Sequence, residues 1–144
     1  MSLAQLIYIS RRNDELTLPV LMDIVEKSKI ANAARGITGL LLCCGDDLMQ
    51  LLEGELNAIQ SLYEVIREDS RHSKVKCLIC KNVRKRIFPE WGMGLADLDH
   101  KSELNRDRLV QLIADVRASH DTSEFGVEAR ILLHDFKLQL GRAA

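Results

Sequence analysis

Two neighbouring apolar runs constrain the fold of this chain more than any other feature. Residues 37–44 and 48–52 are almost entirely apolar, and Gly45-Asp46-Asp47 joins them, as is typical of a β-hairpin. Strands that are apolar on both faces must be covered on both faces of their sheet. The hairpin therefore predicts a central sheet with other parts of the chain packed on each side.

The flanking segments predict an α+β order. Residues 3–9 alternate loosely as a first strand, and Thr17-Leu18-Pro19 marks the start of a helix that Gly36 ends. After Gly54, residues 57–60 are typical of a capping box, and an amphipathic stripe predicts a second helix. The stripe consists of Leu56, Ile59, Leu62, Tyr63 and Ile66.

Two further strands are predicted, over residues 75–83 and 91–95. The order β-α-β-β-α-β-β is that of a ferredoxin-like core with one added strand, which gives a five-stranded mixed sheet. Its two helices cover one face. Residues 1–97 are thus expected to form the core.

Residues 98–144 are predicted to form a helical pair that covers the other face, as a cap or output segment within the same globular unit. Two amphipathic stripes support this expectation. The first consists of Leu109, Leu112, Ile113 and Val116; the second, ended by Gly141, consists of Phe125, Ala129, Leu132, Phe136 and Leu140.

Composition excludes several classes of function. The 144 residues are 47% hydrophobic, enough for one domain with a core, and the net charge is −1. Such a balance argues against a broad surface for nucleic acid. No stretch has the pattern of a signal peptide or the length of a membrane span. We expect a soluble, cytoplasmic protein without nucleic-acid or membrane partners.

The cysteines and the basic run have structural interpretations. Cys43-Cys44 and the Cys77/Cys80 pair lie in predicted strands, where residues one or three apart point to opposite faces. Buried structural thiols are therefore favoured over a metal or redox site, and the histidines show no metal-ligand spacing. Arg84-Lys85-Arg86 is interpreted as a solvated strand end rather than a binding patch.

Three polar residues lie inside apolar elements, namely Tyr8, Asn32 and Gln50. Taken singly, Tyr8 could reach water from a half-buried strand, and Asn32 could lie at a frayed helix end. The amide of Gln50 has four hydrogen-bonding sites to satisfy on the inward face of a central strand. If all three converge, a ligand with its own donors and acceptors would satisfy them together.

The residues around these three resemble a known family. Residues 6–10 read LIYIS, residues 36–42 read GITGLLL, and Gln50-Leu-Leu-Glu-Gly follows. Asp69-Ser-Arg-His and Phe88-Pro-Glu-Trp-Gly-Met come next, in register. Together they resemble the BLUF family of blue-light sensors, over about residues 3–95. The resemblance implies a flavin cofactor, expected to be FAD, with FMN or riboflavin as alternatives.

The resemblance also implies roles for individual residues. Asn32 would bind the polar edge of the flavin, and Gln50 would lie between Tyr8 and the flavin. Trp91 and Met93, predicted to share one face of the fifth strand, would relay the signal; which of them lies beside Gln50 is open, and ordinary core packing is the alternative for both. The residues expected to line or support the pocket are Ser28, Lys29, Asp69, Arg71 and His72.

Four positions depart from the family pattern. Ala31 replaces the first residue of an Asn-Asn pair, and Leu48 replaces a common Phe. Val65 stands at an often basic position, and Gly92 at a common Ser or Ala. None of them belongs to the Tyr8–Gln50 pair, so we expect weaker flavin binding before any loss of photochemistry.

The function implied is a switch rather than an enzyme. Excitation of the flavin would rearrange the hydrogen bonds of Tyr8 and Gln50, by rotation or tautomerisation of the amide. The signal would pass by protein contacts to an unidentified effector, and a homo-oligomer is expected. One alternative is a light-insensitive flavin-binding regulatory module. A distant one is an acylphosphatase-like hydrolase, although the loop Ser10-Arg11-Arg12-Asn13 has no glycine for a phosphate cradle.

Overall fold

A five-stranded sheet forms the centre of the protein. The computed structural model describes residues 2–99, 104–121 and 123–143. The elements are β1 (Leu3–Arg12), α1 (Leu18–Arg35), β2 (Thr38–Cys44), β3 (Asp47–Glu55), α2 (Leu56–Arg67), β4 (His72–Asn82), β5 (Gly94–Asp97), α3 (Leu104–Ala118), the short 3₁₀ helix η1 (Ser123–Phe125) and α4 (Gly126–Ala143). Among the described helices, none combines the length and apolar character that crossing a bilayer requires.

The strand order is β4-β1-β3-β2-β5. Strands β1 to β4 pair antiparallel, whereas β5 lies parallel to β2. This confirms the predicted α+β, ferredoxin-like core with one added strand. In the β1–β3 ladder Tyr8 lies opposite Gln50. Because side chains alternate between the two faces of a strand, this register puts both residues on the same face.

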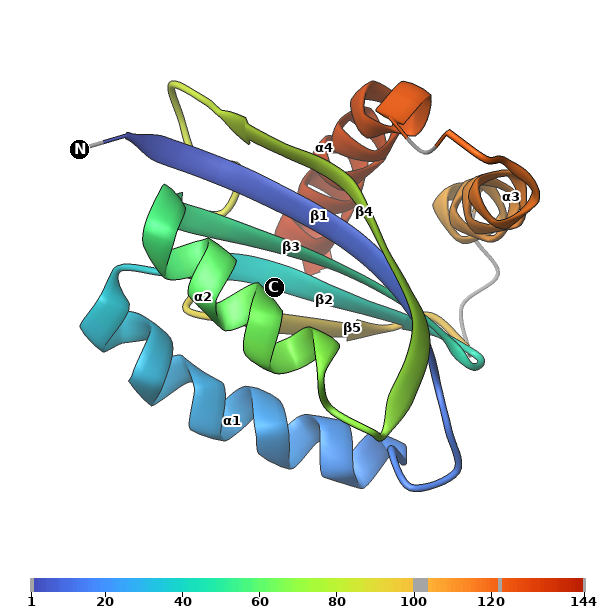
Figure 1. The fold of residues 1–144 in the computed structure, drawn as a ribbon, viewed down its shortest axis with the longest axis horizontal. Coiled ribbons are helices and arrows are strands. Elements are labelled where there is room, and N and C mark those ends of the chain that lie inside the picture. Colours follow the sequence, from blue (N-terminus) through green and yellow to red (C-terminus); the bar gives the residue numbers. More distant parts are fainter. Residues whose placement is uncertain (1, 100–103, 122, 144) are drawn as a thin grey trace.

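Both faces of the sheet are covered by helices (Figure 1). Helices α1 and α2 lie side by side on one face, and their stripes pack with Tyr8, Leu41 and Leu52 in one hydrophobic cluster. Helices α3 and α4 lie on the other face, in a second cluster with Ile7 and Leu42. Each central strand therefore contributes alternate residues to two cores, as the hairpin predicted.

The ends of α1 and α2 are fixed by different residues. Thr17 caps the N-terminus of α1, and Gly36, with φ of 67°, ends it in the left-handed conformation that glycine adopts readily. The predicted capping box at residues 57–60 was wrong. Helix α2 begins earlier, because the carboxylate of Glu55 accepts from the backbone N–H groups of Asn57 and Ala58, both at 3.2 Å.

Two boundaries near the C-terminus also differ from the prediction. Strand β5 begins at Gly94, opposite Leu40, so Trp91 and Met93 precede it and do not share a strand face. Helix α4 continues through Gly141 to Ala143, since a single glycine costs a helix only about 1 kcal/mol. The side chain of Leu140 lies outside the described part.

A buried carboxylate holds the segment that leads to β5. Glu53 is fully buried and accepts from the backbone N–H groups of Ile87 and Phe88, at 2.7 and 2.8 Å, and from Gln5 Nε2 at 2.8 Å. Arg86 is not a solvated strand end, because it donates to Thr38 Oγ1 and to the carbonyls of Glu53 and Gly36. Residues 86–88 are thus tied to the sheet by side chains.

We predict that Glu53→Ala destabilises the protein by about 3 kcal/mol, because it leaves buried donors without an acceptor. Urea denaturation followed by circular dichroism measures this change. Glu90→Ala is the matched control, since Glu90 is exposed on the same segment, and it should change stability by less than about 0.5 kcal/mol. Equal effects of the two substitutions would contradict a structural role for Glu53.

Candidate functional site

A cavity of about 110 Å³ lies under α1 and α2, on the sheet face that carries Tyr8 and Gln50. Most of its wall is apolar, and a few polar groups converge on it. Its lining residues are Tyr8, Leu16, Leu21, Ile24, Val25, Ser28, Asn32, Leu41, Leu48, Gln50, Leu62, Ile66, Asp69, His72 and Met93. An apolar pocket with a few convergent polar groups is the usual form of a small-molecule site.

Tyr8 and Gln50 form a buried hydrogen-bonded pair in this wall. Their exposed fractions are 2% and 7%, and the Tyr8 hydroxyl donates to Gln50 Oε1. The other end of the amide, Nε2, donates to Met93 Sδ at 3.3 Å. A thioether is a weak acceptor. Among the described residues the amide N–H₂ group therefore has no strong acceptor, and a ligand with a carbonyl or ring nitrogen would supply one.

Asn32 reaches the same region from α1. It is 2% exposed, and its Nδ2 donates to the carbonyl of Gly92 at 2.9 Å. Its backbone carbonyl accepts from Ile37 N–H, so the helix is not frayed here. Ser28, one turn earlier on α1, donates to the carbonyl of Ile24 at 2.7 Å. The polar end of the α1 stripe thus faces the cavity, with side chains fixed in place.

Burial keeps Tyr8 protonated. Loss of solvent around the phenol raises its pKa well above the ordinary value of 10, and the charges of Tyr63 and Asp69 raise it further. The Tyr8 ring also contacts the rings of Tyr63 and His72, at centroid distances of 5.5 and 6.4 Å. Tyr8 is therefore a neutral hydrogen-bond donor at any physiological pH.

Polar groups after α2 close one end of the cavity. His72 is held at both ring nitrogens, with Nδ1 2.9 Å from Ser10 Oγ and Nε2 2.6 Å from the carbonyl of Ile66. Asp69 forms an ion pair with Arg71 at 2.6 Å, and that hydrogen-bonded guanidinium lowers the pKa of the Asp69 carboxyl to about 2. This end therefore carries a fixed ion pair near the imidazole, and the carboxylate of that pair belongs to a residue of the cavity wall.

The structure brings most of the predicted site residues together. Tyr8, Ser28, Asn32, Gln50, Asp69, His72 and Met93 line the cavity. Lys29 does not line it and pairs with Glu26 on the surface at 2.8 Å. Arg71 is likewise outside the wall, where it holds Asp69. Trp91 packs against Phe88 at 5.0 Å, within the cluster on the α3–α4 face.

Two contributions to the site could not be read from residue types. The carbonyl of Gly92 binds Asn32, and a backbone group leaves no signal in the sequence. Leu16, just before α1, closes part of the wall although it belongs to no predicted stripe. Two of the positions that depart from the family pattern lie in different places: Leu48 lines the cavity, whereas Val65 is 71% exposed on α2.

Comparison with known proteins shows the class to which this fold and site belong. A family profile described as sensors of blue-light using FAD matches residues 3–94. The chain is 32% identical over 113 residues to the blue light- and temperature-regulated antirepressor BluF of Escherichia coli (strain K12). The aligned region covers 78% of this chain but only 27% of that relative. The chain thus spans about a quarter of that relative's length.

Two solved structures are similar over nearly their whole length. The dark-state structure of BlrB, a BLUF protein, superposes with a TM-score of 0.70 at 27% identity and covers 96% of this chain and 97% of its own. The photo-activated state of BlsA gives a TM-score of 0.71 at 25% identity, with coverages of 91% and 94%.

These matches define a flavin-binding sensor domain rather than a catalytic one. This chain belongs to the BLUF family of blue-light sensors.

We predict that Tyr8 makes stability fall at high pH. The folded state keeps the Tyr8 proton, whereas the unfolded state loses it above pH 10, so the free energy of unfolding falls as pH rises beyond 10. The stability difference between wild type and Tyr8→Phe, measured by urea denaturation at pH 9 to 11, should shift by about 1.4 kcal/mol per pH unit above pH 10. Tyr63→Phe is the control, because Tyr63 is less buried, and it should give a smaller slope. A pH-independent difference for Tyr8→Phe would contradict the burial of its proton.

Proposed function

We propose that this chain holds FAD between α1 and α2 and senses blue light through the Tyr8–Gln50 pair. The observation that carries the proposal is a buried series of hydrogen bonds, in which the Tyr8 hydroxyl donates to the Gln50 amide and the amide donates to the Met93 thioether. Among the described residues, the Gln50 N–H₂ group has only the weak Met93 acceptor. A flavin carbonyl or ring nitrogen would take the place of that thioether as the acceptor. Asn32 and Ser28 would bind the polar edge of the ring, with Asp69 and His72 at the far end.

Binding requires the cavity to widen. Its volume of about 110 Å³ is below the roughly 300–1,000 Å³ of typical ligand pockets. Residues from α1, α2 and the sheet form its wall, so the two helices must separate to admit the ring. Lys29 and Arg71 follow or precede wall residues in the sequence, and their cationic groups would support the phosphates of FAD outside the cavity.

The bound flavin supplies absorption of blue light and an electron acceptor. Tyr8 provides the electron and then its hydroxyl proton, which is available because burial keeps the phenol neutral. While Tyr8 lacks its proton, it no longer donates to Gln50 Oε1, and the amide can rotate or tautomerise. Return of the electron and proton to Tyr8 would restore its hydroxyl beside the rearranged amide. The two ends of a carboxamide are nearly isosteric, so the reversed amide fits the same space with opposite donor and acceptor ends.

The change would leave the site through residues 91–93. Met93 contacts Gln50 on the α1–α2 face, whereas Trp91 packs on the α3–α4 face. A reversed amide presents a different group to Met93 and so alters the packing of this segment between the two cores. We propose residues 1–97 as the sensor core and residues 98–144 as the output cap.

The exposed apolar residues of α4 favour a protein effector or a second copy of the chain as the contact surface. They are Val127, Ile131 and Leu138, with exposed fractions of 62%, 52% and 63%.

We predict that the purified protein is yellow and releases FAD on heating, as identified by chromatography. Tyr8→Phe and Gln50→Ala should keep the flavin but abolish the light-induced red shift of its absorption, because the first removes the donor and the second the movable amide. Tyr63→Phe is the matched control and should retain the shift. A colourless protein that takes up no FAD on refolding would refute flavin binding. A normal shift in either variant would refute the switch.

A further inference from the structure

A basic hollow lies on the side of the sheet that carries α4. It has a volume of about 510 Å³ and lies between the chain segment after β4 and helix α4. Its lining residues, which define the basic hollow, are Lys81, Asn82, Val83, Arg84, Lys85, Arg86, Ile87, Arg130 and His134. It shares none of these residues with the cavity under α1 and α2.

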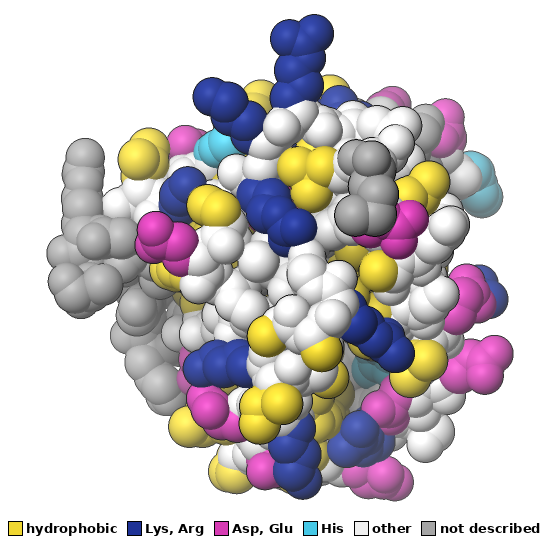
Figure 2. Space-filling view, turned by 90° about the vertical axis from the view of Figure 1, so that its left-hand side faces the viewer, with side chains coloured by type: hydrophobic (Ala, Val, Ile, Leu, Met, Phe, Trp, Pro, Cys, Tyr) yellow, Lys and Arg dark blue, Asp and Glu magenta, His cyan; other side chains and the backbone are white. Residues whose placement is uncertain are grey.

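The charge of the basic hollow is unbalanced. Five of its lining residues are Lys or Arg and none is acidic, although the whole chain has a net charge of −1. Within the described part of the chain, none of these five cations takes part in an ion pair. Figure 2 shows several Lys and Arg side chains on the upper part of this end of the molecule, and others are spread over the rest of the face. A concave surface lined by one sign of charge attracts counter-ions strongly.

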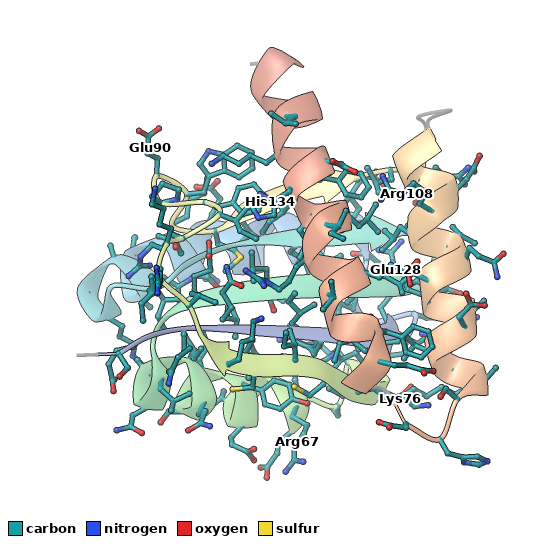
Figure 3. All side chains as sticks on the ribbon, turned by 90° about the horizontal axis from the view of Figure 1, so that it is seen from above. Arg67, Lys76, Glu90, Arg108, Glu128 and His134 are labelled. Atoms are coloured by element: carbon teal, nitrogen blue, oxygen red, sulfur yellow. The ribbon has the colours of Figure 1, made fainter. Side chains whose placement is uncertain are left out.

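Nearby acidic residues are engaged elsewhere. Asp135, next to His134 on α4, pairs with Arg108 at 2.6 Å. Glu90 points away from the molecule, whereas His134 lies on the side of α4 turned toward the segment after β4 (Figure 3). The buried carboxylate of Glu53 accepts from neutral groups of Gln5, Ile87 and Phe88, and Gln5 in turn accepts from Arg130, so this carboxylate lies close to the two inner arginines rather than to the exposed cations. The exposed cations Lys81, Arg84 and Lys85 therefore remain available to an external anion.

Two of the arginines are held in place by neutral acceptors. Arg86 donates to Thr38 Oγ1 at 2.8 Å, to the carbonyl of Glu53 at 3.0 Å and to the carbonyl of Gly36 at 2.7 Å. Arg130 donates from Nε to Gln5 Oε1 at 2.9 Å. Such bonds fix a guanidinium without cancelling its charge. Lys81, Arg84 and Lys85 are exposed and form the rim.

We propose that the basic hollow binds the diphosphate or triphosphate group of a small molecule. Arg86 and Arg130 are the fixed anchors, because a guanidinium matches phosphate oxygens in geometry and charge. The volume is that of a small-ligand site. Val83 and the exposed His134 ring offer a surface for an organic part. This chemistry is shared by inorganic polyphosphate and nucleoside polyphosphates; a long nucleic acid is not favoured, because the basic surface is confined to one hollow.

Calorimetric titration of the flavin-loaded full chain tests the site, with sodium triphosphate and ATP as separate probes in 150 mM NaCl. The test variant is Arg84→Gln/Lys85→Gln, which removes two of the three rim cations without altering buried contacts. The matched control is Lys27→Gln/Lys137→Gln, which removes two exposed charges outside the hollow. We expect at least tenfold weaker binding in the test variant and less than a twofold change in the control.

The two probes separate the possible ligands. Equal affinity for both assigns recognition to the phosphate chain alone, and tighter binding of ATP assigns it to a nucleotide; either result supports the site. No heat from either probe at millimolar concentration would overturn the proposal, as would equal weakening in both variants. Binding of an oligoglutamate peptide with no binding of either phosphate probe would also overturn it, in favour of an acidic protein segment.

Discussion

The hydrogen bond between Tyr8 and Gln50 is the interaction on which the site depends. It joins neighbouring strands on one face of the sheet, and both residues are nearly free of solvent. A slip of one residue between β1 and β3 would move one of the two side chains to the opposite face. The long β1–β3 ladder, from Leu3 opposite Glu55 to Arg11 opposite Asp47, therefore serves the chemistry as well as the core.

The segment from Arg86 to Met93 connects the two faces of the sheet. Its beginning is tied to Glu53, Thr38 and Gly36, and Trp91 packs on the α3–α4 face. Its end places the carbonyl of Gly92 against Asn32 and the sulfur of Met93 against Gln50. Ordinary hydrogen bonds therefore fix the segment as far as Gly92, and only the contact of Met93 with Gln50 is a weak thioether contact. A change at Gln50 acts on the end with the least restraint.

The sequence predicted the architecture because periodicity is a local property. The apolar hairpin, the α1 stripe ending at Asn32 and the glycine at position 36 all led to correct elements. The predicted start of β5 was wrong, because Gly92 and Met93 bind the side chains of Asn32 and Gln50 instead of continuing the strand, and no local pattern marks partners so distant in the sequence. Because of that error, Trp91 and Met93 were predicted to share a strand face, whereas the structure places them on opposite faces of the sheet. Tyr8 and Gln50 were found because buried polar residues stand out in apolar strands, whereas the Gly92 carbonyl leaves no such mark.

The most direct test of the account uses the methyl signals of the methionines in the dark and under blue light. With ¹³C-methyl methionine, NMR resolves Met93 beside Gln50, Met49 in the opposite core and exposed Met22. If the Gln50 amide rearranges in the light, illumination shifts the Met93 signal strongly, leaves Met22 unchanged, and has no effect on Met93 in Gln50→Ala. A flavin spectrum that shifts with light while the Met93 signal stays in place would contradict it.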